Sequence, residues 1–82
     1  MMPLEENSVE DRVLLLLENI VLEGYEILRS SSFEDMGMDS LDKVELLMEL
    51  EDEFNIEIPD DVMVYLETYG EVIDYIRKRL KA

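Results

Sequence analysis

The sequence predicts an all-α fold: a small four-helix bundle with a long loop between the first and second helices and a short third helix. Its 82 residues suffice for one domain, residues 1–82, and leave no room for a second. Hydrophobic residues make up 48% of the chain and recur at helical spacing in separate segments. Gly24 and Pro59 mark two of the breaks between these segments.

The first helix is expected from about Ser8 to Leu22. Asn7 and Ser8 offer a capping signal just before the apolar pattern begins. Its buried face is predicted by five apolar residues at helical spacing: Val9, Val13, Leu16, Leu17 and Ile20.

A long loop should follow, because Glu23-Gly24-Tyr25 ends the first helix and Ile27–Phe33 lacks helical periodicity. We expect Ile27, Leu28 and Phe33 to fill the core from this loop. The triple serine Ser30–Ser32 is expected to stay solvated.

The second helix is predicted from Ser40 to Phe54, with apolar side chains over an arc of roughly 220°. One stripe, the expected core face, contains Leu46, Leu47, Leu50 and Phe54. A second stripe contains Leu41, Val44 and Met48, and it is flanked by Glu45, Glu51 and Asp52. From the pattern alone, this second stripe fits two interpretations equally: partner contact inside a rim of acids, or core filling against the long loop.

Two shorter helical segments complete the bundle. Asn55–Pro59 interrupts the second helix, and a third helix is expected from Asp60 to about Leu66. Thr68 and Glu71 fit a capping box, so the fourth helix should begin near Tyr69. The core stripe of the fourth helix is predicted to contain Val72, Ile73, Tyr75, Ile76 and Leu80.

The charge of the chain restricts its partners. There are 22 acidic and 7 basic residues, a net charge of −15, and 12 of the acids lie between Glu34 and Asp61 with Lys43 as the only base among them. This balance argues against binding to nucleic acid or to an anionic membrane and favours partners with basic patches. The middle of the chain is therefore the expected binding face.

Composition also argues against an enzyme. The chain has no histidine and no cysteine, so the usual proton shuttle, thiol chemistry and common soft metal ligands are missing. Asp35, Asp39 and Asp42 do not have the spacing of a calcium loop, and we expect no dedicated metal site. The start lacks a secretory pattern, and no stretch approaches the ~20 apolar residues of a membrane span, so a soluble cytoplasmic protein is expected. We also expect a monomer.

Ser40 is the main candidate for a functional residue. It stands where a glycine-containing loop should become a helix, with Asp39 placed to cap the first turn. A catalytic serine needs a base and oxyanion donors, and the G-x-S-x-G elbow is missing around Ser40. Ser40 is thus better interpreted as the substrate of another enzyme than as a nucleophile.

The triplet Asp39-Ser40-Leu41 resembles the mark of the acyl carrier protein family, an Asp-Ser-Leu that opens an acidic helix. The resemblance extends in order and spacing over about half of the chain, through Phe33–Asp42, Val44–Leu46, Glu51–Phe54 and Glu57–Asp60. It implies a 4′-phosphopantetheine arm on Ser40 that carries acyl groups as thioesters between enzymes of fatty acid biosynthesis. A peptidyl carrier is disfavoured, because Met38-Asp39 replaces the Gly-His that usually precedes its serine.

The resemblance also implies where partners and the acyl chain are held. Partners would be a phosphopantetheinyl transferase and acyl-processing enzymes with basic patches. They would dock on Asp39, Leu41, Val44, Glu45, Met48, Glu51 and Asp52. A shelter for the acyl chain would be lined by Leu50, Ile58, Met63 and Leu66. Two alternatives remain: a carrier for a polyketide or another specialised acyl pathway, and an unmodified acidic interaction module.

Overall fold

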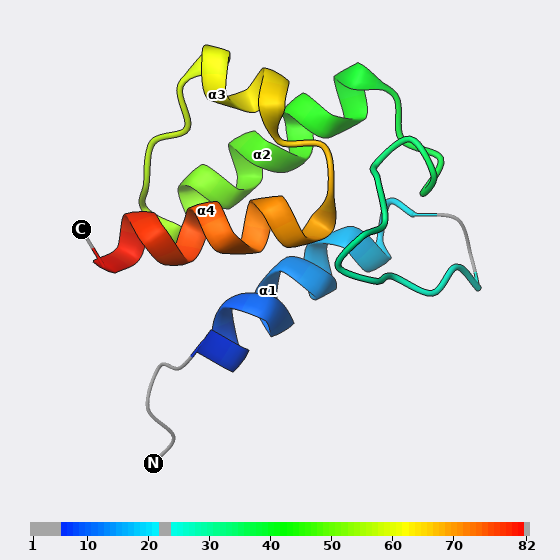
Figure 1. Cartoon of the computed structure of the whole chain (residues 1–82), viewed down its shortest axis with the longest axis horizontal. Helices are drawn as coiled ribbons and strands as arrows, with labels where there is room; N and C mark the ends of the chain where they lie inside the picture. The colour runs from blue at the N-terminus through cyan, green and yellow to red at the C-terminus, as the bar shows by residue number, and fades with distance from the viewer. Residues whose placement is uncertain (1–5, 22–23, 82) are drawn as a thin grey trace.

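The computed structural model describes residues 6–21 and 24–81, and these contain four α-helices and no strand. Figure 1 shows α1 (Glu6–Glu18), α2 (Ser40–Phe54), α3 (Asp60–Tyr65) and α4 (Tyr69–Lys81) in chain order. The all-α prediction, with a long loop between the first two helices and a short third one, is confirmed. None of the described helices is long and apolar enough to cross a membrane.

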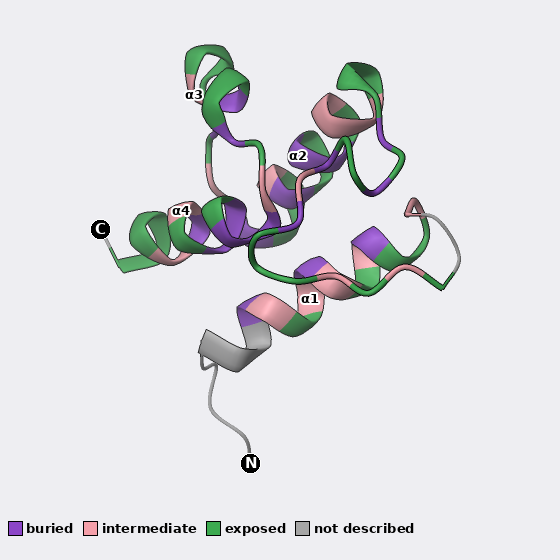
Figure 2. Cartoon of the chain, turned by 45° about the vertical axis from the view of Figure 1, so that its right-hand side comes forward, coloured by how far each residue is buried: buried purple, intermediate pink, exposed green. Residues whose placement is uncertain are grey.

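The four helices and the long loop share one core. α1 packs against α4 and α2, and Figure 2 shows buried residues in each helix and in the loop. The buried residues of α2 are the predicted stripe: Leu46, Leu47, Leu50 and Phe54. Figure 1 places the loop at the end of the molecule where α2 begins. The long loop therefore lies beside the first turn of α2.

The predicted bounds of the first helix are wrong at both ends. α1 begins at Glu6, so Ser8 lies inside the helix and not before its first residue. After Glu18 the helix gives way to a turn, in which the N–H groups of Ile20 and Val21 both donate to the carbonyl of Leu17, at 2.8 and 2.9 Å. The expected end at Leu22 lies outside the described residues.

The long loop is built differently from the prediction in two places. Phe33 is buried as expected, but Leu28 is 52% exposed. Ser31, expected in solvent, is buried: its hydroxyl oxygen accepts the N–H of Leu28 at 2.9 Å and lies 3.2 Å from the hydroxyl of Tyr25. A serine that closes a local turn can be buried because its polar atoms are satisfied.

Leu80 departs from the predicted core stripe of α4. It is 47% exposed. Figure 1 shows that the last turn of α4, which contains Leu80, lies on the side of the molecule opposite the long loop. The start of α4 agrees with the prediction: the N–H of Glu71 donates to the Thr68 hydroxyl at 3.2 Å, and the Glu71 carboxylate accepts the N–H of Thr68 at 3.1 Å. The capping box is therefore confirmed.

The long loop is fastened to the connection between α3 and α4. The two segments run antiparallel and form an isolated bridge at Ser32 and Thr68. Three backbone hydrogen bonds flank this bridge: Phe33 N–H to Glu67 O at 3.0 Å, Tyr69 N–H to Ser31 O at 3.0 Å, and Gly70 N–H to Arg29 O at 2.9 Å. The bridge fixes the position of the chain just before it enters α2.

Gly70 makes this close approach feasible. A Cβ atom at this position would lie 2.9 Å from the carbonyl oxygen of Arg29, which is closer than real side chains come. The Arg29 side chain then reaches across to α4 and donates to both carboxylate oxygens of Asp74, at 3.0 and 2.9 Å. This bond and the charge of Asp74 raise the pKa of Arg29.

Candidate functional site

The chain reaches the site through a tight turn. Gly37 has φ of 86°, a left-handed conformation that suits glycine. The N–H of Met38 donates back to the carbonyl of Phe33 at 3.0 Å, which closes the turn. Met36 and Met38, which sequence reasoning did not assign to the core, are both buried. Their side chains, one before and one after Gly37, anchor the turn in the core.

Asp39 caps α2 in the predicted way. Its carboxylate accepts the N–H of Asp42 at 2.9 Å, and the Asp42 carboxylate accepts the N–H of Asp39 at 3.3 Å. This reciprocal pair is a capping box with two acids, and both are favoured near the positive end of the helix dipole. Ser40 therefore does not need to act as the cap.

Ser40 is the first residue of α2 and is exposed. Among the described residues, none forms a hydrogen bond with its hydroxyl. No histidine exists in the chain to act as a base. The hydroxyl is thus accessible to an external enzyme, and no described residue forms a hydrogen bond that would activate it as a nucleophile.

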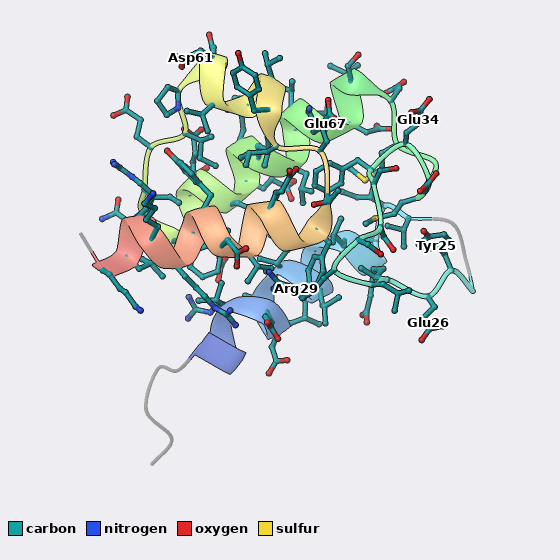
Figure 3. The ribbon with its side chains drawn as sticks, viewed as in Figure 1. Tyr25, Glu26, Arg29, Glu34, Asp61 and Glu67 are labelled. Carbon is teal, nitrogen blue, oxygen red and sulfur yellow. The ribbon has the colours of Figure 1, made fainter. Side chains whose placement is uncertain are left out.

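A hollow of about 280 Å³ lies beside Ser40. It is formed by three segments: the long loop, the first turn of α2 and the α3–α4 connection. Figure 3 shows Glu34 on the loop and Glu67 on the connection, both toward the end where α2 begins. The lining residues are Ser32, Phe33, Glu34, Met38, Asp39, Ser40, Lys43 and Glu67.

The second stripe of α2 lies at the surface. Leu41 is 65% exposed and Met48 is 54% exposed, while Val44 is half-buried. Core filling is therefore the wrong interpretation for Leu41 and Met48. Glu45 and Asp52 are exposed beside them, as expected for a rim of acids.

Glu51 has a structural contact that sequence reasoning did not foresee. It is half-buried, and its carboxylate accepts the backbone N–H of Ile58 at 2.6 Å. The carbonyl of Glu51 also accepts the N–H of Asn55 and that of Ile56. Asn55 has φ of 54°, the left-handed conformation that ends many helices. Glu51 therefore fastens the connection between α2 and α3.

The four residues predicted to shelter an acyl chain are all buried in the shared core: Leu50, Ile58, Met63 and Leu66. None of them lines the hollow beside Ser40. Their role as a shelter stays a prediction. Within the described residues, no group of three or more acidic side chains is arranged to hold a metal ion.

Lys43 is the site residue that sequence reasoning did not single out. It was counted only as the one base among the acids, but the structure places it in the wall of the hollow with Ser40. The sequence could have indicated this role, because Lys43 is three residues after Ser40 and residues i and i+3 share a helix face.

These features define a class of protein: a small helical domain with an exposed serine at the capped start of its second helix. Residues 19–76 match the family model described as the phosphopantetheine attachment site. The chain is 47% identical over 77 residues to an acyl carrier protein of Porphyromonas gingivalis, covering 92% of this chain and 99% of that one. It is 41% identical over 69 residues to an acyl carrier protein of Phenylobacterium zucineum, covering 83% and 87%.

The fold agrees with these relatives. The crystal structure of a mitochondrial acyl carrier protein of Toxoplasma superposes with a TM-score of 0.82, covering 95% of this chain and 93% of that one, at 24% sequence identity. The chain belongs to the acyl carrier protein family.

Proposed function

We propose that this protein carries acyl groups on a 4′-phosphopantetheine arm attached to Ser40 and passes them between enzymes of fatty acid biosynthesis. The observation that carries the proposal is the exposure of Ser40 at the capped start of α2, inside the segment 19–76 that matches the attachment-site family. When attached, the arm supplies a terminal thiol that holds an acyl group as a thioester.

The residues around Ser40 fit such a group. An exposed hydroxyl at a helix start can reach a donor bound in another protein without unfolding of the domain. In the attachment step, a bond from Ser40 Oγ to the phosphorus next to the pantetheine would form. The bond from that phosphorus to the bridging oxygen of the diphosphate of coenzyme A would break, and the nucleotide half of coenzyme A would leave with that oxygen. The transferase must take the hydroxyl proton, because the described site contains no base positioned to do so. A phosphate attached to Ser40 would be next to the positive end of the α2 dipole, where a negative charge is stabilised.

Partner enzymes would dock on α2 beside Ser40. Leu41 and Met48 are apolar anchors that solvent reaches, and Glu45 and Asp52 surround them with negative charge. Such a surface attracts a basic patch over a distance and adds contact area at the end of the approach. The proposed partners are a phosphopantetheinyl transferase and acyl-processing enzymes.

Asp39 and Glu51 contribute to this face differently from the exposed rim. Both carboxylates accept backbone hydrogen bonds in the fold, so each is partly committed to structure. We expect them to add charge to the face but to be poor sites for testing docking.

The proposal also includes the buried acyl shelter, a monomeric state and a cytoplasmic location. Cell fractionation would test the location.

Intact mass spectrometry tests the assignment of Ser40. The protein is incubated with coenzyme A and an active phosphopantetheinyl transferase, and a mass increase of one phosphopantetheine group is expected. Ser40→Ala should abolish the increase and keep the circular dichroism of the wild type. Ser30→Ala, which alters an exposed serine in the long loop, is the matched control and should be labelled normally.

An unchanged wild-type mass would favour the unmodified interaction module, and labelling of another serine would refute the site. A polyketide or other specialised pathway would be indicated by the acyl groups found on protein isolated from its own cell.

A further inference from the structure

We infer that Lys43 and the hollow beside Ser40 form a seat for the first part of the phosphopantetheine arm, with the lysine paired to the phosphodiester. This inference rests on the proposed function and adds a positioning residue to it. The starting observation is that Ser40 and Lys43 line the same hollow of about 280 Å³.

The geometry of the helix brings the two side chains together. Residues three positions apart on a helix have Cβ atoms about 5–6 Å apart, so a lysine can reach a phosphate on the serine that precedes it by one turn. Lys43 is half-buried against the hollow and is not directed fully into solvent.

The charges around the hollow leave this role to one residue. Three carboxylates line it, Glu34, Asp39 and Glu67, and Lys43 is the only base in its wall. A phosphodiester on Ser40 would add another negative charge to this group. In the part of the chain that the structure describes, Lys43 forms no ion pair, whereas Arg12, Arg29 and Arg77 each pair with an acid. Its charge is therefore free to compensate the phosphate.

The remaining wall matches the chemistry of the arm next to the phosphate. That part of the arm carries two geminal methyl groups and then amide N–H groups. Phe33 and Met38, which are only 3% and 4% exposed, form the apolar floor of the hollow that the methyl groups would face. The carboxylates of Glu34 and Glu67 can accept hydrogen bonds from the amides. Since these residues come from the bridged loop and the α3–α4 connection, the seat would restrain the arm against the body of the fold.

Nuclear magnetic resonance of the loaded protein tests this seat. Intact mass first shows whether Ser40 has received the group, and this result alone decides the proposed function. In loaded wild type we expect nuclear Overhauser contacts from the geminal methyl groups to Phe33 and Met38. Lys43→Gln should lose these contacts and shift the ³¹P resonance, while Lys43→Arg, which keeps the charge, should retain the contacts.

Lys78→Gln is the matched control, because it removes the same charge from an exposed position in the last turn of α4. Its spectra should equal those of the wild type. Raising the salt concentration to about 1 M shortens the screening length from about 10 to about 3 Å and should weaken the wild-type contacts. The inference is overturned if loaded wild type shows no contact between arm and hollow, or if Lys43→Gln leaves the contacts and the ³¹P shift unchanged. Loss of the contacts in both Lys43→Gln and Lys43→Arg would also overturn it, since the charge would then not be the cause.

Discussion

Removing the Glu51 side chain should destabilise the fold more than removing a neighbouring acid. In Glu51→Ala, the N–H of Ile58 loses the carboxylate that it contacts at 2.6 Å, and Ile58 itself is only 2% exposed. A hydrogen bond to a charged group contributes about 1.5–3 kcal/mol, and a buried donor without a partner costs a similar amount. We expect a loss of about 2 kcal/mol from a domain whose total stability is on the order of 4–12 kcal/mol.

The assay is urea unfolding followed by circular dichroism, with Glu49→Ala as control. Glu49 is exposed in the same helix, so both variants change helix propensity and net charge equally. With a slope of about 1 kcal/mol per molar urea, Glu51→Ala should lower the midpoint by roughly 2 M, and Glu49→Ala by less than about 0.5 M. Equal midpoints for the two variants would refute the reasoning, and so would unchanged hydrogen exchange at the Ile58 amide.

Two further predictions concern the core. Leu50 is fully buried, so Leu50→Ala should lower the free energy of unfolding by about 2–5 kcal/mol. Leu41 is 65% exposed, so Leu41→Ala should lower it by less than about 1 kcal/mol. Similar urea midpoints for the two variants would contradict the packing of α2. Burial and the nearby charge of Glu10 raise the pKa of Tyr69, so its contribution to stability is complete below a pH of about 10 and is lost as the pH rises through the folded-state pKa. Tyr69→Phe should therefore show a smaller alkaline loss of stability than the exposed-site control Tyr65→Phe, and equal losses would count against this assignment.

The parts of the fold that follow from local rules could be predicted from the sequence. α2 has the predicted bounds and the predicted buried stripe because capping by Asp39 and the spacing of Leu46, Leu47 and Leu50 are both local signals. The start of α4 is correct for the same reason, since Thr68 and Glu71 form the expected capping box. Ser40 is exposed as the first residue of this helix, as the same local signals predict.

The internal contacts of the long loop could not be predicted, because they depend on a segment more than thirty residues away. Ser31 is buried beneath contacts with Tyr25 and Leu28, and its carbonyl bonds the N–H of Tyr69. A pattern of consecutive serines indicates a solvated loop unless such pairing is known. The hollow beside Ser40 has the same origin, because the segment containing Glu67 becomes its third wall only through this bridge.

The distribution of ion pairs explains how the exposed side of α2 stays negatively charged. The three arginine pairs join distant parts of the chain: Arg12 with Glu53 at 3.5 Å, Arg29 with Asp74 at 2.9 Å, and Arg77 with Glu10 at 2.7 Å. Only the pair of Arg12 uses an acid from α2. That acid, Glu53, lies in the last turn of the helix, at the opposite end from Ser40.

Lys78, Arg79 and Lys81 lie in the last turn of α4, where they complement the negative end of its dipole. Apart from Lys43, the basic residues of the described chain therefore lie outside the first turn of α2, and Glu45 and Asp52 stay exposed beside Leu41 and Met48. Because exposed charge raises encounter rates more than it holds a complex together, this arrangement suits a carrier that must be captured and released repeatedly.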